Sequence, residues 1–184
     1  SFASAFLSNT PDAIRKQFDD AILNHVVARH EKLSMPRKLG QTVIEVFNPT
    51  AAAHGWNGSH TSLNIISDDK AFIIDSVIAL LTSKSYLIEF IAHPLVFVAR
   101  DKSGRATDVS STRDEHSQGQ SHIFVQLNRR LTEAEMKALH ADLTEVYQDV
   151  HLSNRDWLNI KAQVKELAGK GAQKRKRGIL DGCT

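Results

Sequence analysis

The feature that most limits how this chain can fold is an alternating apolar run that leads directly into an apolar helix. Over 61–67, Leu63 and Ile65 alternate with polar residues, which is the period of a half-buried strand. Ser67-Asp68-Asp69 can then cap a helix that runs to about Ser83. The helix has a wide apolar surface and a narrow small or polar stripe: Phe72, Ile73, Ile74, Val77, Ile78, Leu80 and Leu81 against Asp75, Ala79 and Thr82. We therefore expect most of the helix surface to be buried.

Further strands are predicted on both sides of this unit. The β-branched residues of 42–47 predict a first strand. The long β-rich run 86–99 contains His93-Pro94, where the missing proline N–H should force a bend, a bulge or an edge position. Asp101-Lys102-Ser103-Gly104 predicts a turn, from which 105–109 can pair back as a short strand.

The segment from Ser110 to Gln120 has almost no apolar residue, and we expect it to be a mobile, poorly ordered loop. After it, Ile123, Val125 and Leu127 alternate as a half-buried strand. The chain therefore returns to the sheet only after this loop.

Three helices flank the strands. Thr10-Pro11-Asp12 predicts the start of one that runs to about Lys32, with a stripe of Ile14, Phe18, Ile22 and Val26. Thr132 and Glu135 have the spacing of a capping box and open a helix with one apolar stripe: Met136, Leu139, Leu143, Val146 and Val150. Ser153 and Asp156 repeat that spacing before a last helix, which ends near Gly169 and has Trp157, Ile160, Val164 and Leu167 inward.

This order of elements is close to the split βαβ arrangement, an α+β fold in which helices cover one face of an antiparallel sheet. No strand pattern follows the second helix. The strand over 42–47 is therefore expected to occupy the position that a C-terminal strand fills in the standard order.

Composition sets broad limits on function. The 184 residues are 41% hydrophobic and 24% charged, which suits a soluble protein with a real core. The formal net charge of +2 is local, because five of the 23 basic residues and one of the 21 acidic residues lie in 169–184. Cys183 stands alone, which fits a reducing, cytoplasmic setting. We expect neither a signal peptide nor a membrane span.

Several kinds of chemistry lack their motifs. No glycine-rich loop follows a strand and opens a helix, so we expect no dinucleotide site, and no Walker loop or nucleophile elbow is present. We predict no catalytic residue and no metal site, since His25 and His30 are five residues apart and no Cys/His cluster exists. The basic run 174–177 lacks interleaved aromatic residues, which favours a solvated tail over nucleic-acid binding.

Two groups of polar residues remain as candidates. His60, His93 and His122 lie at the starts or bends of predicted strands and could meet at one end of the sheet, or each could be a satisfied structural histidine. The carboxylates Asp68, Asp69 and Asp75 could attract a cation, but helix-start residues are the simpler interpretation. If the helix starts at residue 69 or 70, Asp75 lies beyond the first turn, so either a partner contacts it or it is solvated.

A set of short motifs resembles the first part of the large NAD-specific glutamate dehydrogenases. It covers roughly 42–157 and contains Phe47-Asn48-Pro49, Gly55-Trp56, His60-Thr61, Asp68-Asp69, Phe72 to Ser76, His93-Pro94 and Ser121-His122-Ile123. The block Asp68–Ser76 is the most specific part. In that family this region looks like an ACT domain, which binds small effectors, often amino acids, and pairs through its sheet.

The resemblance implies an ACT-like domain over 42–152 that follows a helical lead and linker over 1–41 and precedes a helix over 153–169 and a basic tail over 170–184. It implies a noncatalytic regulatory or oligomerisation segment of a cytoplasmic enzyme whose NAD and catalytic sites lie elsewhere in the polypeptide. The expected partners are the rest of that polypeptide, further copies and an amino-acid effector, with no nucleic acid and no membrane. A stand-alone amino-acid sensor is the alternative.

Under this resemblance, the candidates for effector or interface contact are Asp68, Asp69, Asp75, Ser76, His60, His93 and His122. Two departures from the family matter for their role. Many ACT domains have a glycine in the first strand-to-helix turn, where this chain has Asp69-Lys70-Ala71, and the family's usual proline at position 71 is also replaced. These departures lower the expectation that an effector binds at this turn.

Overall fold

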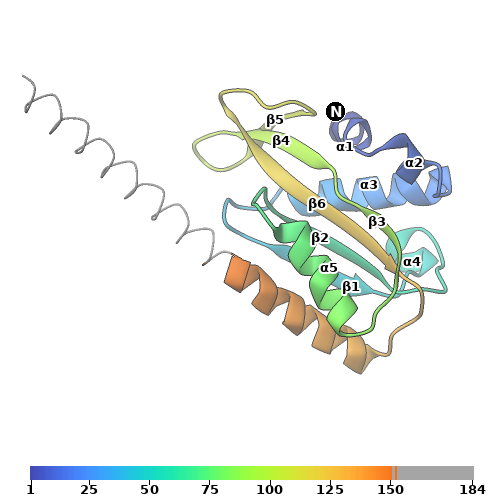
Figure 1. Ribbon diagram of the computed structural model, residues 1–184. Helices are drawn as coiled ribbons and strands as arrows, with labels where there is room; N and C mark the ends of the chain where they lie inside the picture. The colour runs from blue at the N-terminus through green and yellow to red at the C-terminus, as the bar shows by residue number, and fades with distance from the viewer. Residues whose placement is uncertain (151, 153–184) are drawn as a thin grey trace, which may run out of the picture. The chain divides into compact units, whose positions relative to one another are not determined.

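The computed structural model of the chain describes residues 1–150 and 152 (Figure 1). Its elements are α1 (Phe2–Ser8), α2 (Asp12–Arg15), α3 (Asp20–Ser34), β1 (Val43–Phe47), α4 (Ala51–His54), β2 (Ser62–Asp68), α5 (Ile73–Ser83), β3 (Ile88–Ala92), β4 (Leu95–Arg100), β5 (Ala106–Ser110) and β6 (Ser117–Leu127). A further helix begins at residue 133.

One antiparallel sheet contains all six of these strands, in the order β1-β2-β6-β4-β5, and β3 pairs with β6 beside β4. The predicted α+β fold is confirmed. The edge position that a C-terminal strand fills in the standard order is taken by β1, which pairs antiparallel with β2, as the absence of a later strand pattern predicts.

The run 86–99 divides at His93-Pro94, as predicted. Its two halves, β3 and β4, both pair with the same edge of β6. The interruption is therefore a bend between two strands that share one neighbour. Beyond the turn at 101–104, β5 pairs back onto β4. Pro94 thus lies where no ladder N–H is needed.

The prediction of a mobile loop over 110–120 is wrong for its second half. Strand β6 begins at Ser117, and Gly119 and Gln120 are buried between β2 and β4. Polar residues can occupy this central strand because they find partners there: the Gln120 side-chain amide lies 2.7 Å from Ser34 Oγ. Only 111–116 form the connection from β5.

The predicted single helix from Asp12 to Lys32 is interrupted. The Asp19 carboxylate accepts hydrogen bonds from Ala21 N at 2.8 Å and Ile22 N at 3.3 Å, which starts α3 afresh after the short α2. The Thr10 hydroxyl does not cap α2 but donates to the Phe6 carbonyl. The predicted stripe survives the break, because Ile14, Phe18, Ile22 and Val26 still pack in one cluster.

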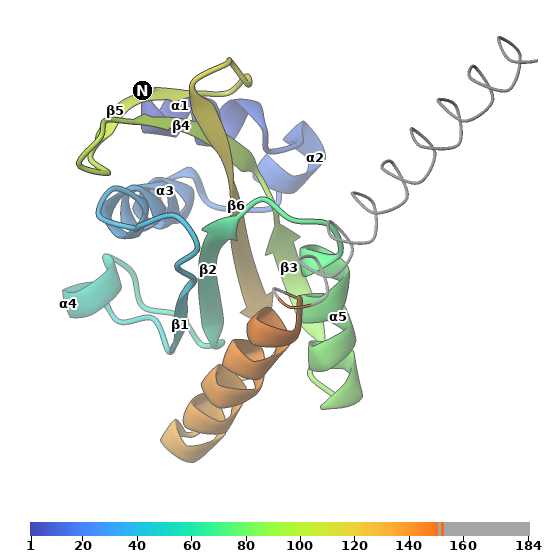
Figure 2. The same cartoon turned by 90° about the vertical axis from the view of Figure 1, so that its left-hand side faces the viewer.

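Helices cover both faces of the sheet (Figure 2). One face carries α5 and the helix that begins at 133, as predicted, over Leu63, Ile65, Ile123, Val125 and Leu127, which are fully buried. The other face carries α1 and α3. There two clusters form, one of Phe2, Phe6, Leu23, Val27, Val96 and Val98 and one of Val26, Phe90, Ala92 and Phe124. The helical lead is therefore part of the core.

Helix α5 is less buried than its composition suggests. Only Ile73, Val77 and Leu81, spaced by four residues, are buried, while Ile78 is 38% exposed. The predicted stripe of Asp75, Ala79 and Thr82 faces outward. A helix on one side of a sheet can bury one stripe only, so the remaining apolar flank of α5 stays accessible.

The capping box at the start of the next helix is confirmed. Thr132 N donates to Glu135 Oε2 at 2.7 Å, and Glu135 N donates to Thr132 Oγ1 at 3.3 Å.

Residues 1–147 form one compact unit. Of 148–184, the structure describes the helical residues 148–150 and 152. The predicted helix over 153–169, the tail and Cys183 lie outside the described residues. No described helix is long and apolar enough to cross a bilayer.

We expect Leu143→Ala to lower the free energy of unfolding by about 2 to 5 kcal/mol, because the fully buried Leu143 packs in the layer over the sheet. Lys137 on the same helix is exposed, so Lys137→Ala should change it by less than about 0.5 kcal/mol. Urea denaturation of the two variants checks this. Equal shifts of the two midpoints would contradict the observed helical phase.

Candidate functional site

The strand-to-helix turn between β2 and α5 has an unusual backbone. Phe72 precedes the first residue of α5 in a left-handed conformation, with φ of 67°, and its residue surface is 72% exposed. For a bulky aromatic residue this region of φ and ψ is strained, and glycine is the residue that adopts it freely. Strained backbone conformations cluster at functional sites, which makes the exposed Phe72 a candidate contact residue.

The predicted cap Ser67-Asp68-Asp69 is wrong. No side chain caps α5, and the Asp68 carboxylate has other partners. It lies 2.7 Å from Arg37 Nη2 and accepts a 2.8 Å hydrogen bond from Gly40 N. The Arg37 side chain is only 2% exposed and also donates to the Gln41 carbonyl at 2.6 Å. Asp68 thus ties the linker before β1 to the end of β2 and is not available to a ligand.

Asp69, Asp75 and His93 lie around the turn. Asp69 is exposed, and its backbone N–H donates to the Gly119 carbonyl at 2.9 Å. His93 Nε2 lies 2.7 Å from Ser121 Oγ. Burial lowers the pKa of His93, whereas the nearby charges of Asp69 and Asp75 act to raise it. The turn therefore presents two carboxylates near a neutral imidazole, a combination suited to an ammonium group and a hydrogen-bonding neighbour.

The position of Asp75 has a local explanation that the sequence analysis missed. Because α5 begins at Ile73, Asp75 lies in its first turn, where negative charge is favoured by the helix dipole. Its side chain is exposed, and the neighbouring Ser76 is half-buried and donates its backbone N–H to the Phe72 carbonyl at 3.0 Å. No buried partner is needed to account for Asp75.

The three predicted histidines do not meet at one end of the sheet. His60 Nδ1 lies 2.6 Å from Glu89 Oε2, beside Gln126 at the far end of β6. His93 and its partner Ser121 are at the β3–β4 bend. His122 follows Ser121 in β6 and therefore points to the opposite face. Among residues 1–150 and 152, no group of three or more His, Cys, Asp or Glu side chains could hold a metal ion.

His122 belongs to a buried polar chain on the face covered by α3. Asn64 Nδ2 donates to Glu45 Oε2 at 3.0 Å, so Asn64 Oδ1 must accept from His30 Nε2 at 3.1 Å. When His30 is neutral, its Nδ1 has no proton and accepts from His122 Nδ1 at 3.2 Å. Burial favours the neutral form of both rings, and with both neutral this pattern assigns one tautomer to each.

The electrostatics of this chain agree with the hydrogen bonds. Burial lowers the pKa of His30 to about 4 and that of His122 well below its ordinary value. Burial alone would raise the pKa of Glu45, but hydrogen bonds from Arg29 and Asn64 outweigh it and lower that pKa. Phe2 and Phe6 pack their rings against His122 at 5.3 and 5.9 Å between centroids. The arrangement is a structural network that binds α3 to the sheet.

Sequence reasoning missed Phe72, Arg37 and His30. The absence of glycine from the strand-to-helix turn was the available sign that another residue had to adopt positive φ there. Arg37 follows Pro36 in a basic link with no pattern that indicates burial. His30 stands four residues after Val26 on the apolar stripe, which marks an inward position.

Comparison with known proteins gives two results. Residues 2–143 match the family described as "Glutamate dehydrogenase, ACT1 domain". An NAD-specific glutamate dehydrogenase of Halomonas elongata is 28% identical over 124 residues, 66% of this chain and 8% of the relative. One of Pseudomonas aeruginosa is 26% identical over 129 residues, 69% of this chain and 8% of the relative. The chain thus spans 8% of the length of these relatives. No solved structure matches.

Phe72→Asn should raise the free energy of unfolding by about 0.5 to 1 kcal/mol, since asparagine tolerates the left-handed conformation and the exposed ring contributes little packing. Phe72→Val should lower it by about 1 kcal/mol or more, because a β-branched residue fits that conformation worst. Chemical denaturation measures both. Equal effects of the two substitutions would show that the backbone at residue 72 is not strained.

The buried histidines predict a loss of stability in mild acid. The folded-state pKa of His30, about 4, is below its ordinary value of 6.5, so the unfolded chain binds more protons as the pH falls below 6.5. From about pH 7.5 to about pH 5, His30 alone should lower the free energy of unfolding by about 2 kcal/mol. Urea midpoints at both pH values measure the decline.

The control is His140→Gln, which alters an exposed histidine and should leave this decline intact. His30→Gln retains a donor near the position of Nε2 but cannot titrate, so the decline should become shallower. An undiminished decline in His30→Gln would assign the pH dependence to other groups.

Proposed function

The chain belongs to the family of the glutamate dehydrogenase ACT1 domain, and on this premise we propose that it is a noncatalytic regulatory and assembly segment near the amino terminus of an NAD-specific glutamate dehydrogenase. The parent polypeptide converts glutamate, NAD and water to 2-oxoglutarate, ammonia and NADH in the cytoplasm. The curated relatives carry that name and are much longer than this chain, which supports a part of a larger enzyme.

The observation that carries the regulatory role is the strained turn at Phe72. The exposed Phe72 lies in the segment between Asp69 and Asp75, and the charges of both carboxylates act on the neutral His93. An amino-acid effector has an ammonium group for the carboxylates and carbon atoms for the ring. Many ACT domains hold an effector at the corresponding turn, but Asp69-Lys70-Ala71 replaces their glycine here, so the support for this location comes from the exposed ring and the carboxylates.

The assembly role rests on apolar surface that the described unit leaves uncovered. Ile78 on α5 is 38% exposed, and Phe72 at the start of the same helix and Leu39 in the linker are more exposed still. An exposed apolar flank on one helix is a surface that another domain or subunit can cover. We infer that α5 contacts the rest of the polypeptide or a further copy of it.

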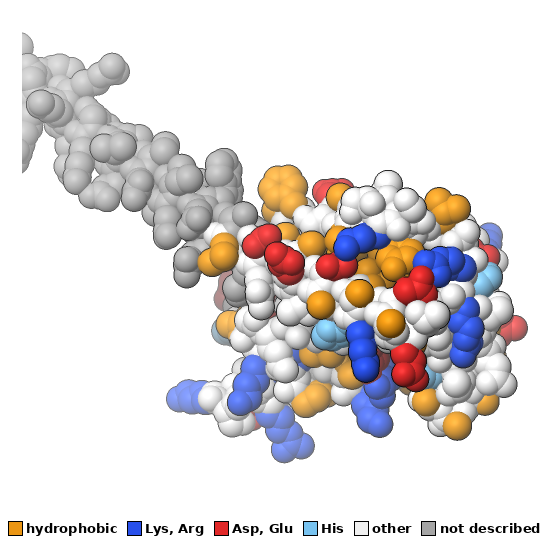
Figure 3. Space-filling view, turned by 90° about the horizontal axis from the view of Figure 1, so that it is seen from below, with side chains coloured by type: hydrophobic (Ala, Val, Ile, Leu, Met, Phe, Trp, Pro, Cys, Tyr) orange, Lys and Arg blue, Asp and Glu red, His pale blue; other side chains and the backbone are white. Residues whose placement is uncertain are grey.

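The proposal places NAD and the catalytic residues elsewhere in the parent. Gly55, the glycine nearest to a dinucleotide motif, ends the short α4 in a left-handed conformation and does not open a helix after a strand. Acidic and basic side chains are intermixed on the face seen in Figure 3, so that face does not resemble a nucleic-acid surface. A stand-alone sensor remains the alternative, and the length of the reading frame distinguishes the two.

Ile78→Asp in the full-length polypeptide should shift the enzyme toward smaller assemblies or loosen the contact of this segment, because a charge would replace apolar surface in the proposed interface. Sedimentation velocity measures assembly size, and limited proteolysis measures how firmly the segment is held. The isolated chain should stay folded, since residue 78 is not in its core.

The matched control is Thr82→Asp, which introduces the same charge on the exposed polar stripe of the same helix. Thr82→Asp should leave the size of the assembly and the rate of limited proteolysis unchanged. If both variants behave like the unmodified enzyme, α5 is not an interface and the assembly role is refuted.

A further inference from the structure

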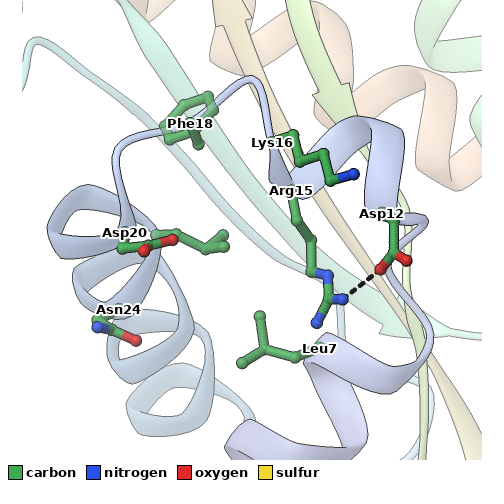
Figure 4. A pocket seen from close by; sticks show the side chains of 8 residues that line it. Leu7, Asp12, Arg15, Lys16, Phe18, Asp20 and Asn24 are labelled. Atoms are coloured by element: carbon green, nitrogen blue, oxygen red, sulfur yellow. Dashed lines mark hydrogen bonds and ion pairs between the residues drawn. The ribbon is translucent and has the colours of Figure 1, made fainter.

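A hollow lies on the face of the sheet opposite the strand-to-helix turn, between α1, α2 and α3 (Figure 4). Its volume is about 650 Å³. This is within the range of small-molecule sites. None of the candidate residues at the turn lines it, so it is separate from the site described above.

The floor of the hollow is apolar and belongs to the core. Leu23 is 7% exposed and packs in the cluster with Val96 and Val98 of β4. The Phe18 ring packs against Phe90 of β3, with 4.2 Å between ring centroids. Leu7 of α1 is half-buried and completes the floor. Because these side chains are fixed by the sheet and the helices behind them, the floor exists before any ligand arrives.

Two charged side chains on the rim are placed to contact a ligand. Arg15 is ion-paired through one nitrogen only, and Asp20 is not used to cap its helix. Arg15 of α2 is paired with Asp12 through Nη2 alone. In the described part of the chain its Nε and Nη1 donate to no other group. The Asp20 carboxylate stands on α3, and capping of that helix is performed by its neighbour Asp19. Figure 4 shows Arg15 and Asp20 on different helices, and both line the hollow.

The charges on the rim favour a particular class of ligand. Arg15 and Lys16 are balanced by Asp12 and Asp20, so the formal charge of the lining is zero. A phosphate or another purely anionic group would meet two carboxylates, and a simple amine would meet two cations. A zwitterion satisfies both signs at once. The apolar floor adds a requirement for a hydrocarbon side chain.

We propose that this hollow binds a free α-amino acid with an apolar side chain. The ligand carboxylate accepts hydrogen bonds from Arg15, whose guanidinium geometry suits a carboxylate. The ligand ammonium group donates to Asp20, and the side chain packs on Leu7, Phe18 and Leu23. This adds a second ligand site to the proposed regulatory role. It needs neither the turn at Phe72 nor the parent enzyme.

Calorimetry on the 184-residue chain tests the site, with L-leucine and L-phenylalanine titrated up to about 10 mM. We expect one molecule to bind per chain. L-Leucinamide lacks the carboxylate and 4-methylpentanoate lacks the ammonium group, so each should bind about tenfold or more weakly than leucine. No binding of leucine or phenylalanine, or equal binding of leucine and leucinamide, would overturn the proposal.

Substitutions assign the contacts. Arg15→Gln should weaken the binding of leucine about tenfold or more and leave the binding of leucinamide unchanged. Asp20→Asn should weaken the binding of leucine to a similar extent and leave the binding of 4-methylpentanoate unchanged. Neither threatens the fold, because α2 has no buried residue and Asp20 is exposed. Lys32→Gln, on the exposed surface of α3, is the control and should bind leucine normally.

The same titration separates this site from the turn at Phe72. Asp75→Asn should leave leucine binding unchanged, because Asp75 lies across the sheet from the hollow. If Asp75→Asn weakens the binding of leucine and Arg15→Gln does not, leucine is bound at the strand-to-helix turn. That result would refute the second site and support the effector role of the turn. Equal binding by all the variants would also refute the site.

Discussion

The pairing of β6 on both of its edges is the constraint on which the rest of the structure depends. Its eleven residues pair with β2 along one edge and with β3 and then β4 along the other. Every other strand except β1 and β5 joins the sheet through it. Because β6 is central, residues on both of its faces must be covered, and this decides where the helices can go.

The two faces meet that demand by different means. Toward α5, β2 and β6 present apolar or small side chains, and the few buried hydroxyls there find nearby partners, such as His93 for Ser121. Toward α3 they present Asn64, Gln120 and His122, each buried. Leaving such groups unpaired would cost about 1 to 3 kcal/mol each. Helix α3 supplies His30 and Ser34 as partners. The helical lead is thus required by the polar residues of the central strands, which explains why it belongs to the same compact unit.

Much of the fold can be predicted from the periodicity of apolar residues in the sequence. The predictions that were wrong have physical causes. Elements that depend on local chemistry were predictable. They include the strands over 42–47 and 61–67, the bend at His93-Pro94 and the capping box at Thr132. The strand over 117–120 was not predictable, since its buried Gln120 is stabilised by Ser34, which lies 86 residues away in the sequence. The break before α3 depends on which of two adjacent aspartates turns back to cap it. Pattern alone does not decide that.

The candidate site was predictable in location but not in geometry. The motifs correctly drew attention to the end of β2, yet Asp68 there is used by the buried Arg37, which carries no signal in the sequence. Gly55 shows the opposite case. It ends α4 with φ of 89°, and a side chain at this position would collide with the His25 ring, so the Gly55-Trp56 motif has a structural cause. A recurring motif can therefore mark a packing requirement as well as a functional one.

Phe72 departs from that logic, because nothing in the fold requires an aromatic ring there. A glycine would satisfy the same backbone without strain, and the ring is too exposed to contribute much packing. Among the described residues, the other non-glycine residue with positive φ is Ser85, which is small and follows α5 in a turn. Nothing in the described unit is known to offset the strain at Phe72. A ligand or a neighbouring domain that covers the ring would supply the burial that the isolated unit lacks.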